Sequence, residues 1–286
     1  MDFTTRIDIR NDGLTLTHAN RLLLLGSCFT DNIGSKLADA GFDPVVNPLG
    51  VLYNPMSILN ALTDSSNPEF LEWTQKESLP GIAPTVEEDI ERADTLIITF
   101  GTAWVYRLKS TGMIVANCKK QPENLFSRER LTSEQIISVW ADFIGKNIEP
   151  KGKKILFTVS PIRHKRDGLH ANQLSKSILL LAVDALCRQF PQTCFYFPSY
   201  EIMMDELRDY RFYADDMLHP SPMAVDYIWE RFRSVYFDAK TIDFIGQFES
   251  LHRILRHRPF DAQNEDYINL IKETTEKLNK LKCSIR

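Results

Sequence analysis

The chain has 286 residues, and its 34 Lys and Arg against 38 Asp and Glu give a net charge of −4. With 43% hydrophobic and 25% charged residues, it has the composition of an ordinary globular protein, which excludes the disordered, collagen-like and coiled-coil classes. The slightly acidic balance argues against a nucleic-acid partner. No apolar run approaches the roughly 20 residues that cross a bilayer, so we expect no membrane partner.

The N-terminal residues and the cysteines bear on the cellular compartment. Residues 1–8 are acidic and polar where a signal peptide has a basic and then an apolar run, so we expect a cytoplasmic protein. An odd number of cysteines without CxxC spacing favours a reduced compartment over a disulfide framework or a zinc site. The cysteines are Cys28, Cys118, Cys187, Cys194 and Cys283.

Short apolar runs that end in small or turn-forming residues predict the strands of a parallel sheet. The first covers residues 21–25 and is followed by a helical pattern from Phe29 to Ala40, which Gly41 ends. Runs that are apolar on both faces suit strands covered by helices on both sides. The other strands are expected at residues 44–46, 95–100, 154–159 and 193–197.

Helical segments alternate with these strands. The alternation predicts an α/β fold, a doubly wound, flavodoxin-like sheet of about five mostly parallel strands flanked by helices. Ligands of such sheets bind in the crevice at the carboxyl ends of the strands, so the residues after each strand are candidates for the site. The helices are expected at residues 57–62, 87–92, 132–147, 171–189 and 222–237.

Three stretches interrupt or follow this alternation. Residues 63–84 are expected to form a surface loop, and residues 104–108 and 113–116 a β-hairpin insertion that overhangs the crevice. Two amphipathic stretches, 244–256 and 266–281, predict a helical appendage. We therefore expect one α/β domain over residues 1–237 and a C-terminal extension, residues 238–286, that packs on the core or on a partner and could join oligomers.

Two candidate nucleophiles, Ser27 and Cys28, follow the first strand. A cysteine at a helix N-terminus is favoured as the thiolate, because unpaired backbone N–H groups and the helix dipole stabilise the anion. The alternative for Cys28 is a structural role, because free cysteine is among the most buried residue types. The alternative for Ser27 is that of the helix cap. The position at a strand end favours a chemical role for this turn.

Asp216 and His219 lie three residues apart in the loop before the last core helix. The aspartate can accept a ring N–H from the histidine and orient the other ring nitrogen toward a nucleophile, as in a catalytic triad. The same spacing also fits a loop in which Asp216 only caps a turn. A nucleophile far upstream at the same sheet edge favours the catalytic interpretation.

With these motifs the sequence resembles the GSCFA family, which is similar to a branch of the SGNH (GDSL) hydrolases. The resemblance covers about residues 20–236 and is carried by several motifs in order. They include Gly26-Ser27-Cys28-Phe29-Thr30, Asn47-Pro48-Leu49-Gly50, Tyr53-Asn54-Pro55, Gly101-Thr102-Ala103-Trp104, Asn117-Cys118, Asn172-Gln173, Ser175-Lys176 and Asp216 to Pro220.

The resemblance implies an acyl-transfer enzyme without a cofactor, an esterase or O-acyltransferase acting on a small-molecule, carbohydrate or cell-envelope precursor. Alignment through Gly26 and Thr30 places Cys28, rather than Ser27, as the nucleophile. His219 would be the base and then the acid, and Asp216 would orient it.

The oxyanion hole implied by the resemblance departs from the usual pattern. Gly50 matches a glycine whose N–H serves the oxyanion hole. Ala103 stands where the third sequence motif of the SGNH hydrolases usually has asparagine. The third donor would then come from Thr102, Asn54 or Asn117. Because one donor is lost, the alternative function is a non-catalytic protein that binds a carbohydrate or acylated metabolite in the same crevice.

Arg163 and His164 follow a core strand and should also face the crevice. Arg163 can bind a carboxylate or phosphate, or pair with an acidic residue between 201 and 216. His164 can act as a second acid or base, or contact the substrate. A metal site built on His164 and His170 matches no strong ligand pattern, so we expect no metal.

Overall fold

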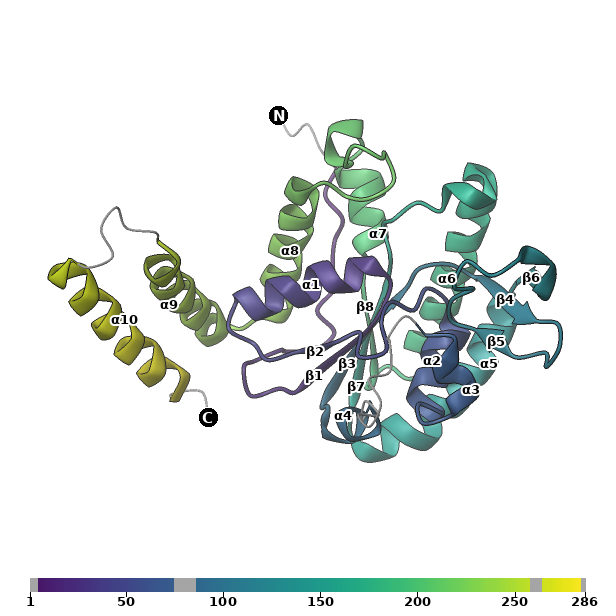
Figure 1. Cartoon of the computed structure of the whole chain (residues 1–286), viewed down its shortest axis with the longest axis horizontal. Coiled ribbons are helices and arrows are strands. Elements are labelled where there is room, and N and C mark those ends of the chain that lie inside the picture. Colours follow the sequence, from purple (N-terminus) through teal and green to yellow (C-terminus); the bar gives the residue numbers. More distant parts are fainter. Residues whose placement is uncertain (1–4, 75–85, 258–263, 284–286) are drawn as a thin grey trace.

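Five short apolar runs form the parallel sheet at the centre of the molecule (Figure 1). The computed structural model describes residues 5–74, 86–257 and 264–283. Each pair of neighbouring strands is parallel, as predicted. The strands lie in the order β2 (Val45–Val46), β1 (Leu22–Gly26), β3 (Thr95–Phe100), β7 (Lys154–Val159) and β8 (Cys194–Phe197).

Helices cover both faces of this sheet, because alternate residues of each buried strand point in opposite directions. Leu23 and Leu25 belong to one apolar cluster, and Leu22 and Leu24 to the other. The first cluster packs against α2 (Pro55–Thr63), α4 (Val86–Arg92), α5 (Ser133–Phe143) and α6 (Leu169–Gln189), and the second against α1 (Cys28–Asp39) and α8 (Pro222–Tyr236). These helices match the predicted segments, and the doubly wound fold is confirmed.

The chain reverses its direction of winding between β1 and β3. It moves outward from β1 to β2 at one edge, then returns to add β3, β7 and β8 on the other side of β1. In doubly wound sheets such a switch point opens a crevice at the carboxyl ends of the strands. The turn after β1 and the segment after β3 therefore border the crevice.

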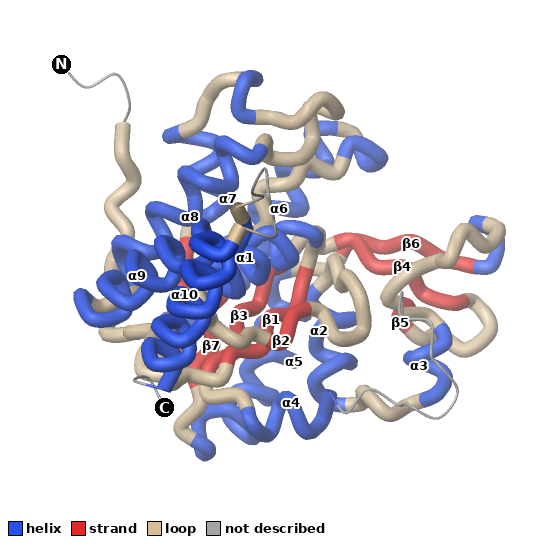
Figure 2. The backbone as a smooth tube through the Cα atoms, turned by 60° about the vertical axis from the view of Figure 1, so that its left-hand side comes forward, coloured by secondary structure: helices blue, strands red, loops and turns tan. Residues whose placement is uncertain are grey.

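A second, antiparallel sheet lies to one side of the first (Figure 2). It contains the predicted hairpin, β4 (Trp104–Leu108) and β5 (Ile114–Val115), and a third strand, β6 (Phe126–Arg130), which was not predicted. Arg128 of β6 lies 4.6 Å from the ring centroid of Trp104 and pairs with Asp167. Cross-strand contacts of this kind stabilise a strand whose own sequence is almost entirely polar.

The expected loop at residues 63–84 is partly helical. Helix α3 (Pro68–Glu72) begins after Asn67, whose side chain accepts the N–H of Glu69, and it buries Phe70. Proline at the first helical position after an asparagine cap is a common helix start, so the prediction of a loop was wrong for this stretch. Residues 75–84 of the predicted loop lie outside the described residues.

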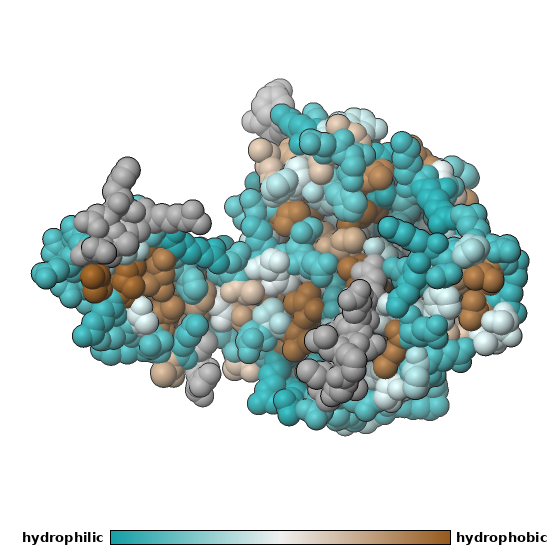
Figure 3. Space-filling model, in the orientation of Figure 1, coloured by the Kyte–Doolittle hydropathy of each residue, from teal (hydrophilic) through white to brown (hydrophobic). Residues whose placement is uncertain are grey.

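Two long helices follow the α/β core, α9 (Ala239–Arg256) and α10 (Glu265–Cys283), at the end of the molecule opposite the second sheet (Figure 1). The ring of Phe244 on α9 lies 4.1 Å from the ring of His18 in the core. Phe248 of α9 shares a small apolar cluster with Leu278 of α10. Apolar side chains gather on the surface of this helix pair (Figure 3). None of the described helices is long and apolar enough to span a membrane.

The remaining helical elements are short. The π-helix Ile144–Ile148 continues α5, and the π-helix Ile202–Glu206 continues α7 (Ser199–Glu201). Single 3₁₀ turns lie at Glu123–Leu125, Glu149–Lys151, Lys165–Asp167 and Tyr210–Phe212.

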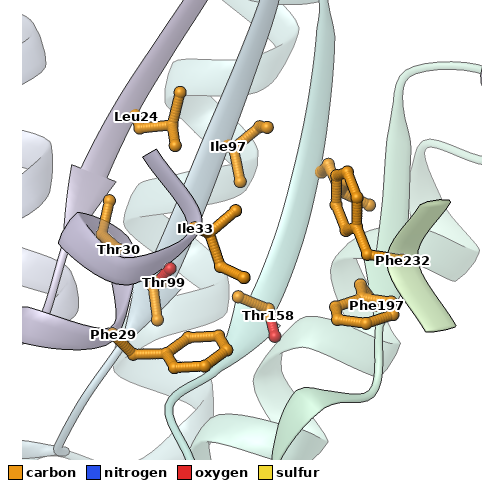
Figure 4. Close-up of a pocket in the computed structure, with 10 residues that line it drawn as sticks. Leu24, Phe29, Thr30, Ile33, Ile97, Thr99, Thr158, Phe197 and Phe232 are labelled. Atoms are coloured by element: carbon orange, nitrogen blue, oxygen red, sulfur yellow. The ribbon is translucent and has the colours of Figure 1, made fainter. Parts of the chain in front are cut away.

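One small cavity lies inside the apolar layer between the sheet and α1 (Figure 4). Leu24, Ile33, Phe197 and Phe232 line it, and its volume of about 10 Å³ is close to the room of a single water molecule. It cannot hold a substrate, which directs attention to the carboxyl ends of the strands, where the ligands of doubly wound sheets bind.

Candidate active site

The turn after β1 is packed tightly against β3. Gly26 has a φ angle of 153°, and a Cβ atom there would lie 2.4 Å from the carbonyl oxygen of Thr99. Its N–H donates to Oδ1 of Asn47 at 2.9 Å, and the Asn47 amide donates to Asp31 on α1 at 2.6 Å. These bonds fix the backbone that carries the next two residues.

Ser27 and Cys28 differ sharply in their surroundings. Ser27 is 1% exposed, and its Oγ accepts the N–H of Phe29 as the N-cap of α1. Cys28 is the first residue of that helix and is partly exposed, with its Sγ 3.7 Å from the hydroxyl of Tyr53. Of these two candidate nucleophiles, only the cysteine is therefore partly accessible to solvent.

Asp216 holds His219 with both carboxylate oxygens. Oδ2 lies 2.5 Å from Nδ1 of His219, and Oδ1 accepts the backbone N–H groups of His219 and Leu218 at 3.0 and 2.9 Å. These backbone hydrogen bonds, with that of His219 first, lower the pKa of Asp216 to about 2. This aspartate therefore both caps the turn and hydrogen-bonds the ring of His219, and the catalytic role of the pair stays a prediction.

The loop of Asp216 and His219 is fastened to the segment that follows β7. The backbone N–H of Arg163 donates to the carbonyl of Leu218 at 3.1 Å, and its guanidinium Nη1 donates to the carbonyl of Met217 at 3.4 Å. Both side chains of the acid–histidine pair remain nearly half exposed, at 44% and 46%. The pair is thus fixed at the carboxyl edge of the sheet and open to solvent.

His164 is a partly buried histidine at this edge, and its Nε2 atom is inaccessible to solvent. Its backbone N–H donates to Oδ1 of Asn172 at 2.9 Å, and its ring meets that of Tyr53 edge-on at 6.2 Å. Within the described residues, its Nε2 has no hydrogen-bond partner. Burial lowers the pKa of His164 to about 3, and the charges of Lys176 and His219 act in the same direction. Tyr53 therefore contacts both Cys28 and His164, and the two histidines are close enough to interact electrostatically.

Lys176 joins two of the loops that border the crevice. It is 1% exposed, and its Nζ donates to the carbonyl oxygens of Gly101 after β3 and Ser160 after β7, both at 2.6 Å. Burial lowers its pKa to about 7. The sequence reasoning did not identify this residue as a site residue, although a lysine on the apolar face of the predicted helix at residues 171–189 was a signal for it.

Two predicted oxyanion donors are committed to bonds elsewhere. The N–H of Gly50 donates to the carbonyl of Asn47 at 2.8 Å. The N–H of Thr102 donates to the carbonyl of Tyr53 at 2.9 Å, and its hydroxyl accepts the N–H of Trp104 at 3.1 Å. These hydrogen bonds do not support the predicted role of either residue.

The two asparagine candidates act in their own turns. Asn54 caps α2 by accepting the N–H of Ser57 at 2.8 Å, and Oδ1 of Asn117 accepts the N–H of Lys119 at 2.7 Å. Donation from their side-chain amides to a substrate stays a prediction.

The remaining candidates are readily located. None of the ion pairs within the described residues includes Arg163, so the predicted pairing with an acid between 201 and 216 is not seen.

All five cysteines are free. Burial raises the pKa of Cys187 to about 12. Over residues 5–74, 86–257 and 264–283, no cluster of three or more His, Cys, Asp or Glu could hold a metal ion.

Comparisons with known proteins point to one family. The model of the GSCFA family matches residues 21–79 and 76–232. Among solved structures, the fold is similar to a mutant of an acetyl-xylooligosaccharide esterase from Geobacillus Stearmophilus, with a TM-score of 0.46 and 11% identity over 77% of this chain and 95% of that one. A search of the curated proteins found no match.

Proposed function

The chain belongs to the GSCFA family, and from the geometry of its crevice we propose that it is an acyl-transfer enzyme, an esterase or O-acyltransferase, with Cys28 as the nucleophile. One observation carries the proposal. Asp216 orients His219 in a loop tied to the segment after β7, at the sheet edge that also carries the partly exposed Cys28. Nucleophile, base and orienting acid are the parts that acyl transfer requires.

The first half-reaction forms a thioester. His219 takes the proton of the Cys28 thiol on Nε2. The resulting thiolate attacks the acyl carbonyl carbon, a C–S bond forms, and the carbonyl electron pair moves to oxygen. The tetrahedral intermediate then collapses, and the C–O bond to the alcohol breaks. His219 gives its Nε2 proton to the leaving alkoxide, while Nδ1 stays hydrogen-bonded to Asp216.

The second half-reaction releases the acyl group. Water or a substrate hydroxyl loses its proton to Nε2 of His219 and attacks the thioester carbonyl carbon. The C–S bond breaks, which returns the thiolate of Cys28. The nature of the second nucleophile decides between hydrolysis and transfer to a small molecule or a carbohydrate.

One of the two oxyanion donors that we assign, the Tyr53 hydroxyl, departs from the family pattern. We assign the backbone N–H of Cys28, at the start of α1, and the hydroxyl of Tyr53, which lies 3.7 Å from the attacking sulfur. The hydroxyl compensates for the side chain missing at Ala103. A single donor of this kind is worth about 10²–10³ in rate.

A burst experiment tests the nucleophile. Mixing the protein with 4-nitrophenyl acetate should release 4-nitrophenolate in a burst and leave an acetyl group on Cys28, located by peptide mass spectrometry. Cys28→Ala should abolish both signals. Ser27→Ala should keep them and lower stability by about 1 kcal/mol through loss of the helix cap. A full burst in Cys28→Ala would disprove the assignment.

The exposed thiol of Cys283 supplies the control. Cys283 is exposed near the end of α10, far from the crevice in the chain. Cys283→Ser should leave the burst unchanged, whereas His219→Ala should slow both the burst and the labelling of Cys28 by iodoacetamide. Equal labelling rates with and without His219 would contradict the proposed pair.

The second candidate function is a protein that binds an acylated metabolite or carbohydrate without turnover. The hydrogen bonds that occupy Gly50 and Thr102 favour it, since they remove two expected oxyanion donors. The burst experiment separates the two functions, because a binding protein forms no acyl-thioester at Cys28.

A further inference from the structure

A small pocket lies beside the loop that carries Asp216 and His219. Its volume of about 210 Å³ is below the 300–1,000 Å³ usual for a whole ligand, so it suits one substituent of a larger molecule. Its lining combines two arginines, Arg163 and Arg208, two tyrosines, Tyr210 and Tyr213, and apolar side chains that include Met203 and Leu207.

The pocket shares a wall with the loop of the proposed catalytic pair. The backbone N–H of Arg163 is bonded to Leu218, one residue before His219. Tyr213 forms a β-bridge with Pro220, one residue after it. A group bound in this pocket therefore lies next to the histidine that would act on the rest of the same molecule.

The lining of the pocket has a net positive charge, since it contains two arginines and one carboxylate. None of the ion pairs within residues 5–74, 86–257 and 264–283 includes Arg163 or Arg208. The guanidinium of Arg163 instead lies 5.8 and 5.4 Å from the ring centroids of Tyr210 and Tyr213. The one carboxylate of the lining is that of Asp209. It accepts the backbone N–H of Arg211 and forms an ion pair with the Arg211 side chain.

We propose that this pocket binds an anionic group, a phosphate or a carboxylate, of the ester whose acyl group is transferred at Cys28. The inference rests on the proposed function and adds the class of substrate to it, an ester with a negative charge near the scissile bond. The planar guanidinium of Arg163 can bind either anion with two hydrogen bonds. The aromatic and apolar walls would contact the carbon skeleton next to the anion.

A binding experiment tests the pocket without turnover. Phenyl phosphate and benzoate are titrated calorimetrically into the wild-type protein and its variants. Arg163→Gln should weaken the bound probe about 10- to 100-fold, since a hydrogen bond to a charged group is worth that factor in affinity. Arg163→Lys, which keeps the charge but loses the planar fork, should fall in between. Lys165→Gln removes an exposed charge two residues away and should change the affinity less than twofold.

The outcomes separate the two anions. Binding of phenyl phosphate alone assigns a phosphate, binding of benzoate alone assigns a carboxylate, and binding of both assigns a general anion pocket. Absence of saturable binding, or equal affinities in wild type and Arg163→Gln, overturns the inference. Arg208→Gln, on the exposed rim, repeats the test if the first variant does not fold.

A kinetic experiment separates this inference from the proposed function. Three acetyl esters are compared, the neutral methyl 4-acetoxybenzoate and the anionic 4-acetoxybenzoate and 4-acetoxyphenyl phosphate. The anionic ester is chosen to carry the same anion as the probe that binds. The ratio of its kcat/KM to the kcat/KM of the neutral ester should fall at least tenfold in Arg163→Gln and stay constant in Lys165→Gln. An unchanged ratio in Arg163→Gln refutes the anion pocket. Full turnover in Cys28→Ala with normal probe binding refutes only the nucleophile.

Discussion

Replacing Lys176 by methionine should change how the stability of the protein depends on pH. The ammonium group is enclosed between the loops after β3 and β7, and within the described residues it donates hydrogen bonds to two carbonyl oxygens, those of Gly101 and Ser160. Burial lowers its pKa from an ordinary 10.5 to about 7. Methionine fills a similar volume without a titrating group.

The sign and size of the effect follow from proton linkage. Above about pH 7 the folded protein holds Lys176 neutral, while the unfolded chain keeps it protonated up to its ordinary pKa of 10.5. The unfolded state binds more protons, so stability rises with pH through this window, by at most about 1.4 kcal/mol per unit. Between pH 7 and pH 8.5 the gain amounts to roughly 1.5 kcal/mol, an upper limit because the two hydrogen bonds favour the charged form.

Urea unfolding, followed by tryptophan fluorescence at constant ionic strength, measures this gain. The difference in unfolding free energy between wild type and Lys176→Met should grow in favour of wild type from pH 7 to pH 8.5, with equal m-values. Lys165→Met, which removes an exposed lysine, should show no such trend. A flat difference for Lys176→Met would show that the lysine does not lose its proton on folding and would refute the reasoning.

Three further outcomes follow from the site. Asp216→Asn should lower kcat/KM on any accepted ester about 10²-fold, measured at an unchanged melting temperature, because the amide no longer stabilises a charged imidazole ring. Burial lowers the pKa of His164 to about 3, so the unfolded chain binds its proton first and stability should fall from about pH 6.5 toward pH 3. In His164→Gln this acid limb should be shallower by urea unfolding. Gly26→Ala should cost more than about 3 kcal/mol, since its Cβ would meet Thr99, whereas Gly112→Ala, in open space, should cost about 1 kcal/mol.

The sheet and the location of the site could be predicted from the sequence because both depend on local patterns. Each core strand is a short run of apolar residues bounded by turn formers, and the parallel order brings every strand end to one edge. Cys28 and Asp216 are far apart in the chain, yet both lie at that edge. The rule that ligands bind at strand ends therefore predicts that they belong to one candidate site.

The elements that sequence reasoning missed depend on contacts between distant residues. Strand β6 has a polar sequence without a strand pattern, and Trp104 and Asp167 hold it from two other segments. Lys176 lies 75 residues from one of the two carbonyl groups that it binds. A lysine is usually exposed, so only the fold reveals that this one is buried. The hydrogen bonds that occupy Gly50 and Thr102 arise in the same way, from turn geometry that a motif alignment does not contain.

Tyr53 connects the departures from the family pattern to the proposed chemistry. Its carbonyl accepts the N–H groups of both Gly101 and Thr102, at 2.8 and 2.9 Å. These two backbone donors of the segment after β3 therefore point toward the loop after β2. The same residue brings its hydroxyl to 3.7 Å from Cys28 and its ring against His164. The loss of a side-chain donor at Ala103 and the commitment of the neighbouring amides are thus matched by one new hydroxyl at the sulfur. Under the proposed function, an oxyanion donor moved from the segment after β3 to the loop after β2 would allow acyl transfer without the usual asparagine.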